Sequence, residues 1–516
     1  MGGAMASIVI SVIVLVILRY TVKLANTYWF RPKKMEKRLR NLGFRGNQYR
    51  IIFGDAKDVG KTRAAATSRP MEPSDKIASR ILPYYHNMVQ KYGMNSPVCK
   101  TFFLWFGTKA RLTISDPVLV KDILSRTEEF RKPNNDQMAR VLVGGLFSSE
   151  GKTWAQHKKI LNPAFHIDKT KNMVPSIVES CSQMMNKWNI SVASNKSVEV
   201  EMRPQIDVLI YDIMCRALVA GPISEEAKEI YQQRMILNQQ AAKLARLMFY
   251  PGWWNLSTQE VKTMRAGHKE TERLVKKVVT RRLEEMKQGA SDHGDILSLL
   301  LEAFQDPASG FSLDDVIEEC RTFHFLGVES TARSLIWVLY VLANYPEWQE
   351  RARAEVLQVF GDQKPNAEGM NQLKIVTMII YETLRFYPPN GVIHRSISKD
   401  TKLGDMVLPA WIQVTIPIAL MNHDPDIWGE DVNEFKPERF AQGIFNSKMQ
   451  SIFLAFFSGP RRCTGQTMGT VLITFVVATL LQGFSLELAP SYSHAPRYSF
   501  FLVPEHGLQL VLRQHI

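Results

Sequence analysis

The sequence has little cysteine, no internal repeat and no long disordered tract, and each absence excludes a class of protein. Five cysteines among 516 residues, scattered and odd in number, do not form a disulfide framework and favour a reducing compartment. The absence of a repeat excludes solenoids and propellers. Zinc-finger spacings and basic blocks interleaved with aromatics are also missing. Despite a net charge of +14, nucleic acid is therefore not an expected partner.

What is present begins with an apolar segment. Met5–Leu18 carries no charge, and it reaches the roughly 20 residues of a membrane span if Arg19 and Lys23 extend toward the headgroups. The basic residues follow it, as in an uncleaved signal anchor: Arg31, Lys33, Lys34, Lys37, Arg38 and Arg40. Because basic flanks stay in the cytosol, we expect a single-pass protein of the endoplasmic reticulum membrane whose catalytic domain faces the cytosol.

The rest of the chain predicts a mainly α protein with small β-sheets, an α+β class. We divide it into a membrane anchor (1–24), a basic linker (25–50) and one catalytic domain (51–516). Helical periodicity covers Asp116–Phe130, Met173–Trp188, Gln205–Leu218, Thr258–Lys287, Leu313–Asn344 and Glu347–Phe360. Short strand patterns cover Thr101–Phe106, Arg111–Ile114, Val407–Leu408, Val414–Ile416 and Leu508–Leu512.

A cysteine loop near the C-terminus carries the strongest chemical signal. Phe456–Gly465 reads FFSGPRRCTG and precedes an apolar helical stretch. A thiolate ligand of haem iron needs nearby cations, a close backbone and a helix N-terminus. Arg461 supplies a cation, and Gly459 and Gly465 permit a close approach. These residues would suit a Cys463 thiolate that binds haem iron, and the alternative is a free cysteine in a turn.

The string Phe456-x-x-Gly459-x-Arg461-x-Cys463-x-Gly465 resembles the haem-binding signature of the cytochrome P-450 superfamily. The resemblance covers nearly the whole chain beyond the anchor. It implies the P-450 fold, haem b (iron protoporphyrin IX) as cofactor, Cys463 as metal ligand, and Phe456, Gly459, Arg461 and Gly465 as haem-contacting residues. It also implies a monooxygenase that uses O2 and receives electrons from an NADPH–cytochrome reductase, without binding NADPH itself.

A second constellation is Glu382 and Arg385, which are three residues apart and therefore share a helix face. An exposed pair of this kind contributes little stability, but apolar residues surround this one. Together with Arg439 it resembles the superfamily's Glu-Arg-Arg triad. We predict a structural role for the three side chains.

A third constellation interrupts the long helix Leu313–Asn344, at whose start Ser312 and Asp315 predict a variant capping box. Gly327, Glu329 and Ser330 resemble the family's oxygen-activation motif. There the glycine makes room for dioxygen, the alcohol hydrogen-bonds it and the acid relays protons. The alternative is that Ser330 bonds back to a helix carbonyl and Glu329 faces water. Ser330 stands where the family usually has threonine and Leu326 where it has a small residue, so we expect altered coupling efficiency and a narrower pocket.

Cations for the haem propionates come from three places. Trp154 and Lys158 resemble the family's Trp-x-x-x-Arg motif, with lysine in place of arginine and so without bidentate geometry. Arg395 matches a second propionate partner, and Arg461 is the third.

The segments YWFRPKKMEKRLRNLGFRGNQYR, WAQHKKILNPAFH and HDPDIWGEDVNEFKPERF resemble the plant branch that includes secologanin synthase. The resemblance implies oxidation of a small apolar to amphipathic terpenoid: an iridoid, a triterpenoid or a diterpenoid hormone. We expect substrate contacts from Asn134–Phe147, the helix face near His324, Asn390–Ile393 and Ser499–Leu502. For His324 itself the more common alternative is a satisfied core histidine. An acidic reductase surface would dock on Arg461, Arg462 and Lys448.

Two rival functions remain open at this stage. A haem-thiolate isomerase or dehydratase would need neither O2 nor a reductase, and the acid–alcohol pair argues against it. A non-catalytic membrane haem protein would need no groove at Gly327.

Overall fold

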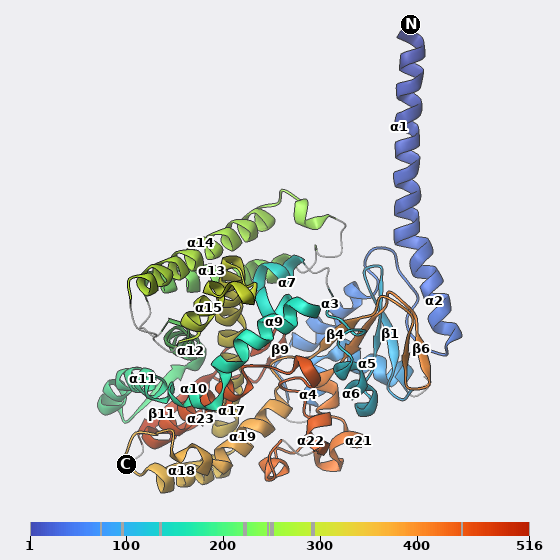
Figure 1. Cartoon of the computed structure of the whole chain (residues 1–516). Helices are drawn as coiled ribbons and strands as arrows, with labels where there is room; N and C mark the ends of the chain where they lie inside the picture. Colours follow the sequence, from blue (N-terminus) through green and yellow to red (C-terminus); the bar gives the residue numbers. More distant parts are fainter. Residues whose placement is uncertain are drawn as a thin grey trace.

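The structure, a computed structural model, describes residues 2–72, 75–93, 98–133, 137–219, 224–244, 247, 252–289, 295–444 and 447–514. Within these residues, a mainly helical body carries a long N-terminal helix that projects away from it (Figure 1). Small sheets lie at the side of the body nearest to this helix and again near the C-terminus. This arrangement confirms the predicted α+β class.

Long helices form most of the body. Those of nine or more residues are α1 (Gly2–Ala25), α2 (Arg31–Asn41), α3 (Ala56–Thr67), α5 (Pro83–Tyr92), α6 (Pro117–Ser125), α9 (Gly151–Leu161), α11 (Val174–Asn195), α12 (Met202–Val219), α13 (Glu225–Leu244), α14 (Gln259–Lys287), α15 (Ile296–Gln305), α16 (Leu313–Thr322), α17 (Val328–Asn344), α18 (Pro346–Phe360), α19 (Lys374–Phe386) and α23 (Gln466–Gly483). The shorter ones are α4 (Ile77–Ile81), α7 (Gln137–Leu142), α8 (Gly145–Ser148), α10 (Ile167–Lys171), α20 (Ile418–Met421), α21 (Pro425–Trp428) and α22 (Ser447–Ile452).

The strands form four small sheets. The largest has the order β1 (Phe102–Phe106), β2 (Lys109–Thr113), β7 (Gln413–Ile416), β4 (Ile393–Ser396), in which only β2 and β7 run parallel. A three-stranded sheet joins β3 (Ser197–Glu201), β11 (Gln509–Gln514) and β8 (Phe484–Leu488). Two hairpins pair β5 (Thr401–Leu403) with β6 (Met406–Leu408) and β9 (Pro496–Tyr498) with β10 (Leu502–Pro504). The five predicted strands are all present within a few residues.

The helix predicted over Asp116–Phe130 is shorter than expected. It starts at Pro117 with Asp116 as its N-cap, and it ends at Ser125 because Arg126 leaves the helical region with ψ 66°. The Arg126 N–H still donates to the Asp122 carbonyl as the C-cap, and its side chain hydrogen-bonds the carbonyl of Lys402 in β5. The local periodicity did not reveal this helix end.

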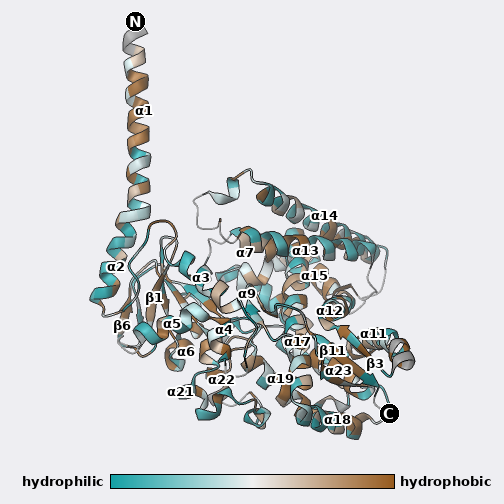
Figure 2. Ribbon diagram, turned by 180° about the vertical axis from the view of Figure 1, so that it is seen from behind, coloured by the Kyte–Doolittle hydropathy of each residue, from teal (hydrophilic) through white to brown (hydrophobic). Residues whose placement is uncertain are grey.

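Three helices are long and apolar enough to cross a membrane in the described part of the chain. The stretch formed by α16 and α17, and helix α23, are largely buried inside the body, whereas the N-terminal segment has no buried residue in its apolar window. Figure 2 shows hydrophobic residues along α1 and more hydrophilic residues on α2. The α16–α17 stretch and α23 are therefore core helices, whereas α1 has the properties of a membrane anchor.

The segment predicted as a basic linker is largely helical. A π-helical turn at Asn26–Phe30 joins α1 to α2. One face of α2 is buried through Pro32, Glu36 and Leu39. Leu39 then joins a core cluster with Phe44 and the sheet residue Trp105. The anchor is thus attached to the body through a packed helix.

The long central helix keeps its predicted ends but changes its internal geometry. Ser312 and Asp315 form the predicted capping box at its start. A π-helical turn, Phe323–Gly327, separates α16 from α17. Such turns accommodate one extra residue and occur often at functional sites. This one lies directly before Glu329 and Ser330.

Candidate active site

The cysteine loop lies between α6 and the start of α23. Phe457 has φ +62° and Gly459 has φ +69°, and the Cys463 N–H donates to the Phe456 carbonyl at 2.9 Å. Helix α23 begins three residues after Cys463, so its N-terminal dipole favours negative charge on the sulfur.

The structure gives a specific reason for Gly459. A Cβ there would lie 2.4 Å from the carbonyl oxygen of Leu124 at the end of α6. A side chain would therefore displace the backbone. The nearest atom to a Cβ at Gly465 is a Phe165 carbon at 3.8 Å. Packing against α6 therefore requires glycine at position 459, which is a reason different from the predicted approach to a haem face, whereas a Cβ at Gly465 would make only an ordinary contact with the Phe165 ring.

The Cys463 thiol lies in surroundings that suit a metal-bound sulfur. Its side chain is exposed to open space, yet burial by the surrounding protein raises the pKa of the thiol. The Gly465 N–H, Arg462 and Lys132 act in the opposite direction. A metal ion that binds such a thiol replaces its proton outright.

Trp154, Lys158 and Arg461 meet as predicted. From α9, Lys158 lies 5.2 Å from the Trp154 ring centroid, and Arg461 covers the same ring at 4.2 Å. The Lys158 ammonium donates to the Pro460 carbonyl of the cysteine loop. Arg461 pairs with Glu150 at 2.8 Å and is 5% exposed. The aromatic ring therefore holds two cations next to the loop.

A further cation, Lys132, lies near Arg461 and Arg395, and the sequence analysis did not predict it. Burial, with Arg461 and Arg395 nearby, lowers the pKa of Lys132 to about 7. Burial and Arg461 also lower the pKa of Arg395 to about 10. The Lys132 ammonium lies 3.9 Å from the Phe147 ring centroid. In the sequence, Lys132 looks like any surface lysine, since only burial distinguishes it.

We call Lys132, Lys158, Arg395 and Arg461 the cation cluster. Among the described residues, Glu150 is the carboxylate that pairs with it. The cluster therefore holds more positive than negative charge in a largely buried place, which is costly without an anionic partner. The two propionates of a haem would supply that charge. These residues fit a haem, because the Cys463 thiol can bind its iron and the cation cluster can pair with its propionates.

The predicted triad is assembled in the core. Arg385 donates to both oxygens of Glu382, at 2.8 and 2.7 Å, and both side chains are 0% exposed. Arg439 lies 3.5 Å from Glu382 and pairs with Asp431 at 2.7 Å. Arg385 also donates to the carbonyls of Asn422 and Val432, at 2.7 and 3.0 Å. Here the charges balance without a ligand.

The oxygen-activation segment combines both predicted alternatives. Ser330 donates to the Leu326 carbonyl at 2.7 Å, as an ordinary helical serine does. Glu329, however, does not face water: it is 7% exposed. A Cβ on Gly327 would lie 3.1 Å from the Met214 methyl of α12, so glycine here also permits close helix packing.

Glu329 lies in a buried polar network that the sequence did not reveal. Asn238 of α13 donates to it at 2.9 Å, Arg234 lies at 3.6 Å and Arg333 at 3.4 Å. Arg333 also bonds Asp207 of α12. Arg234, Asn238 and Asp207 lie about 90 to 120 residues from Glu329 in the sequence. Helical periodicity alone could not have paired them.

Two of the predicted substrate segments converge on one apolar cluster. It contains Met138, Val141 and Leu142 of α7, Phe501, and Phe325 and Leu326 of the π-helical turn. The Phe325 and Phe500 rings lie 6.2 Å apart. In the predicted segment Asn390–Ile393, Gly391 contacts the neighbouring Tyr498 ring. Asn134 and the two residues after it lie outside the described residues.

His324 does not join the apolar cluster. It lines a different cavity of about 270 Å³, between α12, α13, α14 and α15. Its ring lies 5.6 Å from that of Tyr211. Burial, with Arg234 nearby, lowers the pKa of His324 to about 4. The predicted role of this histidine in substrate contact therefore gains no support, because its side chain points to the helices behind the turn.

The predicted reductase surface needs a correction as well. Arg461 is 5% exposed and its guanidinium contacts Glu150, Ser149 and Trp154. It therefore does not present charge to a docking protein. Arg462 hydrogen-bonds Gln466 at 2.6 Å. The side chain of Lys448 lies outside the described part.

Comparison with known proteins agrees with this geometry. Residues 79–512 match the family model for Cytochrome P450. The chain is 38% identical over 506 residues to Cytochrome P450 716A67 of Medicago truncatula (96% of each chain). It is 37% identical over 515 residues to Cytochrome P450 72A15 of Arabidopsis thaliana (99% of each). It is 38% identical over 521 residues to 11-oxo-beta-amyrin 30-oxidase of Glycyrrhiza uralensis (98% of each).

These similarities extend over nearly the full length of each relative and include the anchor region. They agree with the fold and with the thiol and cation cluster, which fit haem b. They also favour the monooxygenase over the isomerase and the non-catalytic haem protein. The chain therefore belongs to the cytochrome P450 family, as a haem-dependent monooxygenase of the plant type.

Proposed function

We propose that this protein oxidises a triterpenoid-type carbon skeleton at a membrane surface. The observation that carries the proposal is full-length similarity to a relative whose name is 11-oxo-beta-amyrin 30-oxidase, at 38% identity. The apolar cluster around Phe325 and Phe501 suits such a skeleton, since it offers aromatic and aliphatic contacts and little charge. Iridoids and diterpenoid hormones are the second choice.

The haem would be held by residues from distant segments. We infer that Cys463 binds the iron, that Phe456 and Gly465 line the ring, and that Trp154 and the cation cluster hold the propionates. Bound haem supplies the activation of O2. One oxygen atom enters the substrate and the other leaves as water, with two protons and two electrons consumed. The electrons come from NADPH through a reductase.

The π-helical turn and Glu329 would control proton supply. Ser330 can donate toward the substrate side only after its hydroxyl leaves the Leu326 carbonyl. Without the methyl group of threonine, it rotates freely between the two positions. Glu329 is held by Arg234, Arg333 and Asn238, and these side chains must loosen for it to exchange a proton with solvent.

We further propose the location and the division of the chain. Residues 1–24 anchor the protein in the endoplasmic reticulum membrane in a single pass. Residues 25–50 connect this anchor to residues 51–516, which form the cytosolic catalytic domain. The exposed and mostly apolar helix α1 and the basic residues after it support this orientation.

Product formation tests the function. Membranes that contain the full chain and a plant reductase receive NADPH, isotopically labelled O2 and a panel of oleanane triterpenoids, iridoids and diterpenoids. We expect one labelled, reductase-dependent product from a triterpenoid. A labelled product from an iridoid alone would overturn the substrate class and leave the reaction class intact.

Cys463→Ser is the control for the chemistry. We expect it to abolish both the product and the red-shifted Soret band of the reduced carbon monoxide complex, because a hydroxyl does not replace the thiolate. Survival of that band would refute the assignment of the iron ligand.

A further inference from the structure

Helix α2 carries an open pocket lined by polar residues beside the apolar N-terminal helix. It follows the π-helical turn Asn26–Phe30, which contains Tyr28, Trp29 and Phe30, residues typical of the membrane–water interface. Lys33 comes three residues later, about 5 Å further along a helix axis. Figure 1 shows α1 standing free and α2 lying against the body at its base.

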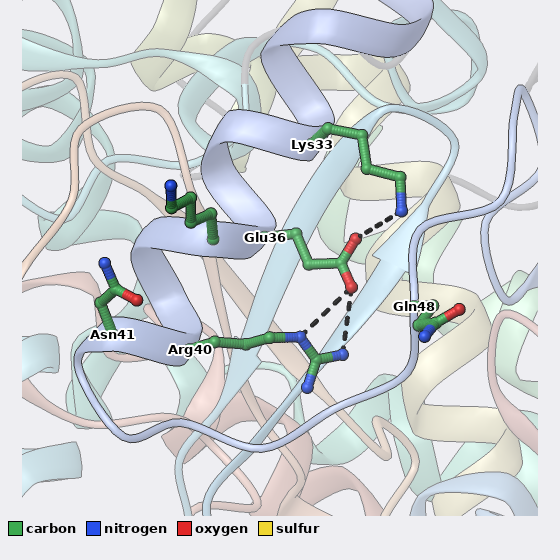
Figure 3. Close-up of a pocket in the computed structure, with 6 residues that line it drawn as sticks. Lys33, Glu36, Arg40, Asn41 and Gln48 are labelled. Atoms are coloured by element: carbon green, nitrogen blue, oxygen red, sulfur yellow. Dashed lines mark hydrogen bonds and ion pairs between the residues drawn. The ribbon is translucent and has the colours of Figure 1, made fainter.

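A pocket of about 360 Å³ opens on α2. Its lining is entirely polar: Lys33, Glu36, Lys37, Arg40, Asn41 and Gln48. Figure 3 shows the Glu36 carboxylate between the ammonium of Lys33 and the guanidinium of Arg40. Lys33 donates at 3.0 Å, and Arg40 donates through two nitrogens at 3.2 and 3.1 Å.

Glu36 holds the side chains of Lys33 and Arg40 in place. It is 6% exposed, and it also accepts a hydrogen bond from the Tyr49 N–H at 3.2 Å. Burial acts to raise its pKa, but the hydrogen bonds from Lys33, Tyr49 and Arg40 outweigh it and lower the pKa below the ordinary value. The carboxylate is therefore charged and already occupied.

The pocket keeps surplus positive charge after this pairing. Lys33, Lys37 and Arg40 supply three cations against the single carboxylate of Glu36, and the amides of Asn41 and Gln48 add hydrogen-bond donors. Arg40 is further fixed by its bond to the Gly46 carbonyl at 3.1 Å. An anion with several acceptor oxygens suits this set, and a phosphate ester has that chemistry.

We propose that this pocket binds the phosphate group of an anionic membrane phospholipid. The position just past the interfacial aromatics favours a lipid headgroup over a soluble phosphate, because α1 brings the pocket to the membrane surface. Lipid binding at this place would fix the tilt of α2, and with it the orientation of the catalytic body relative to the membrane.

The test uses the full-length protein in detergent, titrated with dioleoyl phosphatidate, with bound lipids counted by native mass spectrometry. The variant Lys33→Ala/Lys37→Ala should bind phosphatidate about tenfold more weakly. The matched control is Arg31→Ala/Lys34→Ala, which removes the same charge from the same helix outside the pocket. It should bind within about twofold of the unaltered chain. Both variants should keep the reduced carbon monoxide spectrum.

Three results would overturn the proposal. Equal losses in the two double variants would mean a diffuse basic surface. Equal binding of dioleoyl phosphatidylcholine would mean that the site does not select an anionic lipid. Complete displacement of phosphatidate by a modest excess of inorganic phosphate would mean a site for soluble phosphate.

Discussion

Two groups of buried charges in this protein are built in opposite ways. Around Glu382, Arg385 and Arg439, each guanidinium has a carboxylate partner, and Arg385 also has carbonyl partners. In the cation cluster, four basic side chains surround a single carboxylate in the described residues. Balanced charge holds a scaffold together by itself. Surplus charge marks a place where a ligand completes the structure.

The Glu329 network lies between these two cases. Asp207 and Glu329 balance Arg234 and Arg333 in number, yet the three side-chain nitrogens of Arg234 have no hydrogen-bond partner among the described residues. Such a network is balanced in charge and incompletely bonded. It can therefore change its pairing with less loss than the triad can, which suits a proton path.

The largest expected effect comes from breaking the balanced group. Glu382→Ala leaves Arg385 buried without a carboxylate and should lower the free energy of unfolding by about 3–5 kcal/mol. Urea denaturation followed by circular dichroism measures the change. The matched control is Glu487→Ala, which breaks the exposed pair with Arg513 and should cost at most about 1 kcal/mol. Similar losses in both variants would contradict the distinction.

The next effect concerns the intermediate network. Glu329→Gln keeps the shape of the side chain and removes its proton exchange, so turnover should fall by about 10²-fold. The haem spectrum should stay unchanged. Product formation per NADPH consumed and the solvent isotope effect measure the result. Normal turnover with an unaltered isotope effect would show that Glu329 is only a structural member of the network.

A smaller effect is expected when one surplus cation is removed. Lys132→Met keeps the buried stem and deletes the charge. The haem-free protein should lose no stability, because repulsion by Arg395 and Arg461 is relieved. Haem should be released roughly tenfold faster, as transfer to apomyoglobin would measure, since one charge-assisted hydrogen bond is lost. A destabilised haem-free protein with unchanged haem release would contradict the surplus-charge interpretation.

The last prediction concerns His423, a buried histidine beside the balanced group, and uses pH in place of a mutation. Burial, with Arg385 nearby, lowers the pKa of His423 to about 3. Below the ordinary histidine pKa near 6.5, the unfolded chain takes up a proton that the folded chain refuses. Stability should therefore fall as the pH decreases from about 6.5 toward 3, by about 1.4 kcal/mol per pH unit for this histidine.

His423→Gln tests that slope. The amide of glutamine reaches the position of the imidazole Nε2, which contacts the Phe386 carbonyl at 3.0 Å, but it does not titrate. Urea denaturation at pH 7, 6 and 5 should show a shallower loss of stability in the variant. Identical pH slopes in the variant and the unaltered chain would rule out this contribution.

Short-range patterns predicted several features correctly. The cysteine loop, the capping box at Ser312 and the spacing of Glu382 and Arg385 are set within a few consecutive residues, and the structure contains each of them. Other features depend on segments that only the fold brings together. Lys132, Arg234 and Asn238 carry no local sign of their surroundings. The burial of the Arg461 guanidinium against Glu150 and Trp154, which removes it from the predicted docking surface, was missed for the same reason.

The amino-acid sequence by itself determined the apolar N-terminal helix, the helical class and the cysteine loop, because each rests on contiguous residues and on periodicities of the backbone. Only the tertiary structure decided which charges are balanced. Burial multiplies the cost of an unpaired charge, and burial is a property of neighbours that lie far apart in the chain. The cation cluster, the Glu329 network and the proposed lipid pocket on α2 all consist of side chains that only the fold brings together.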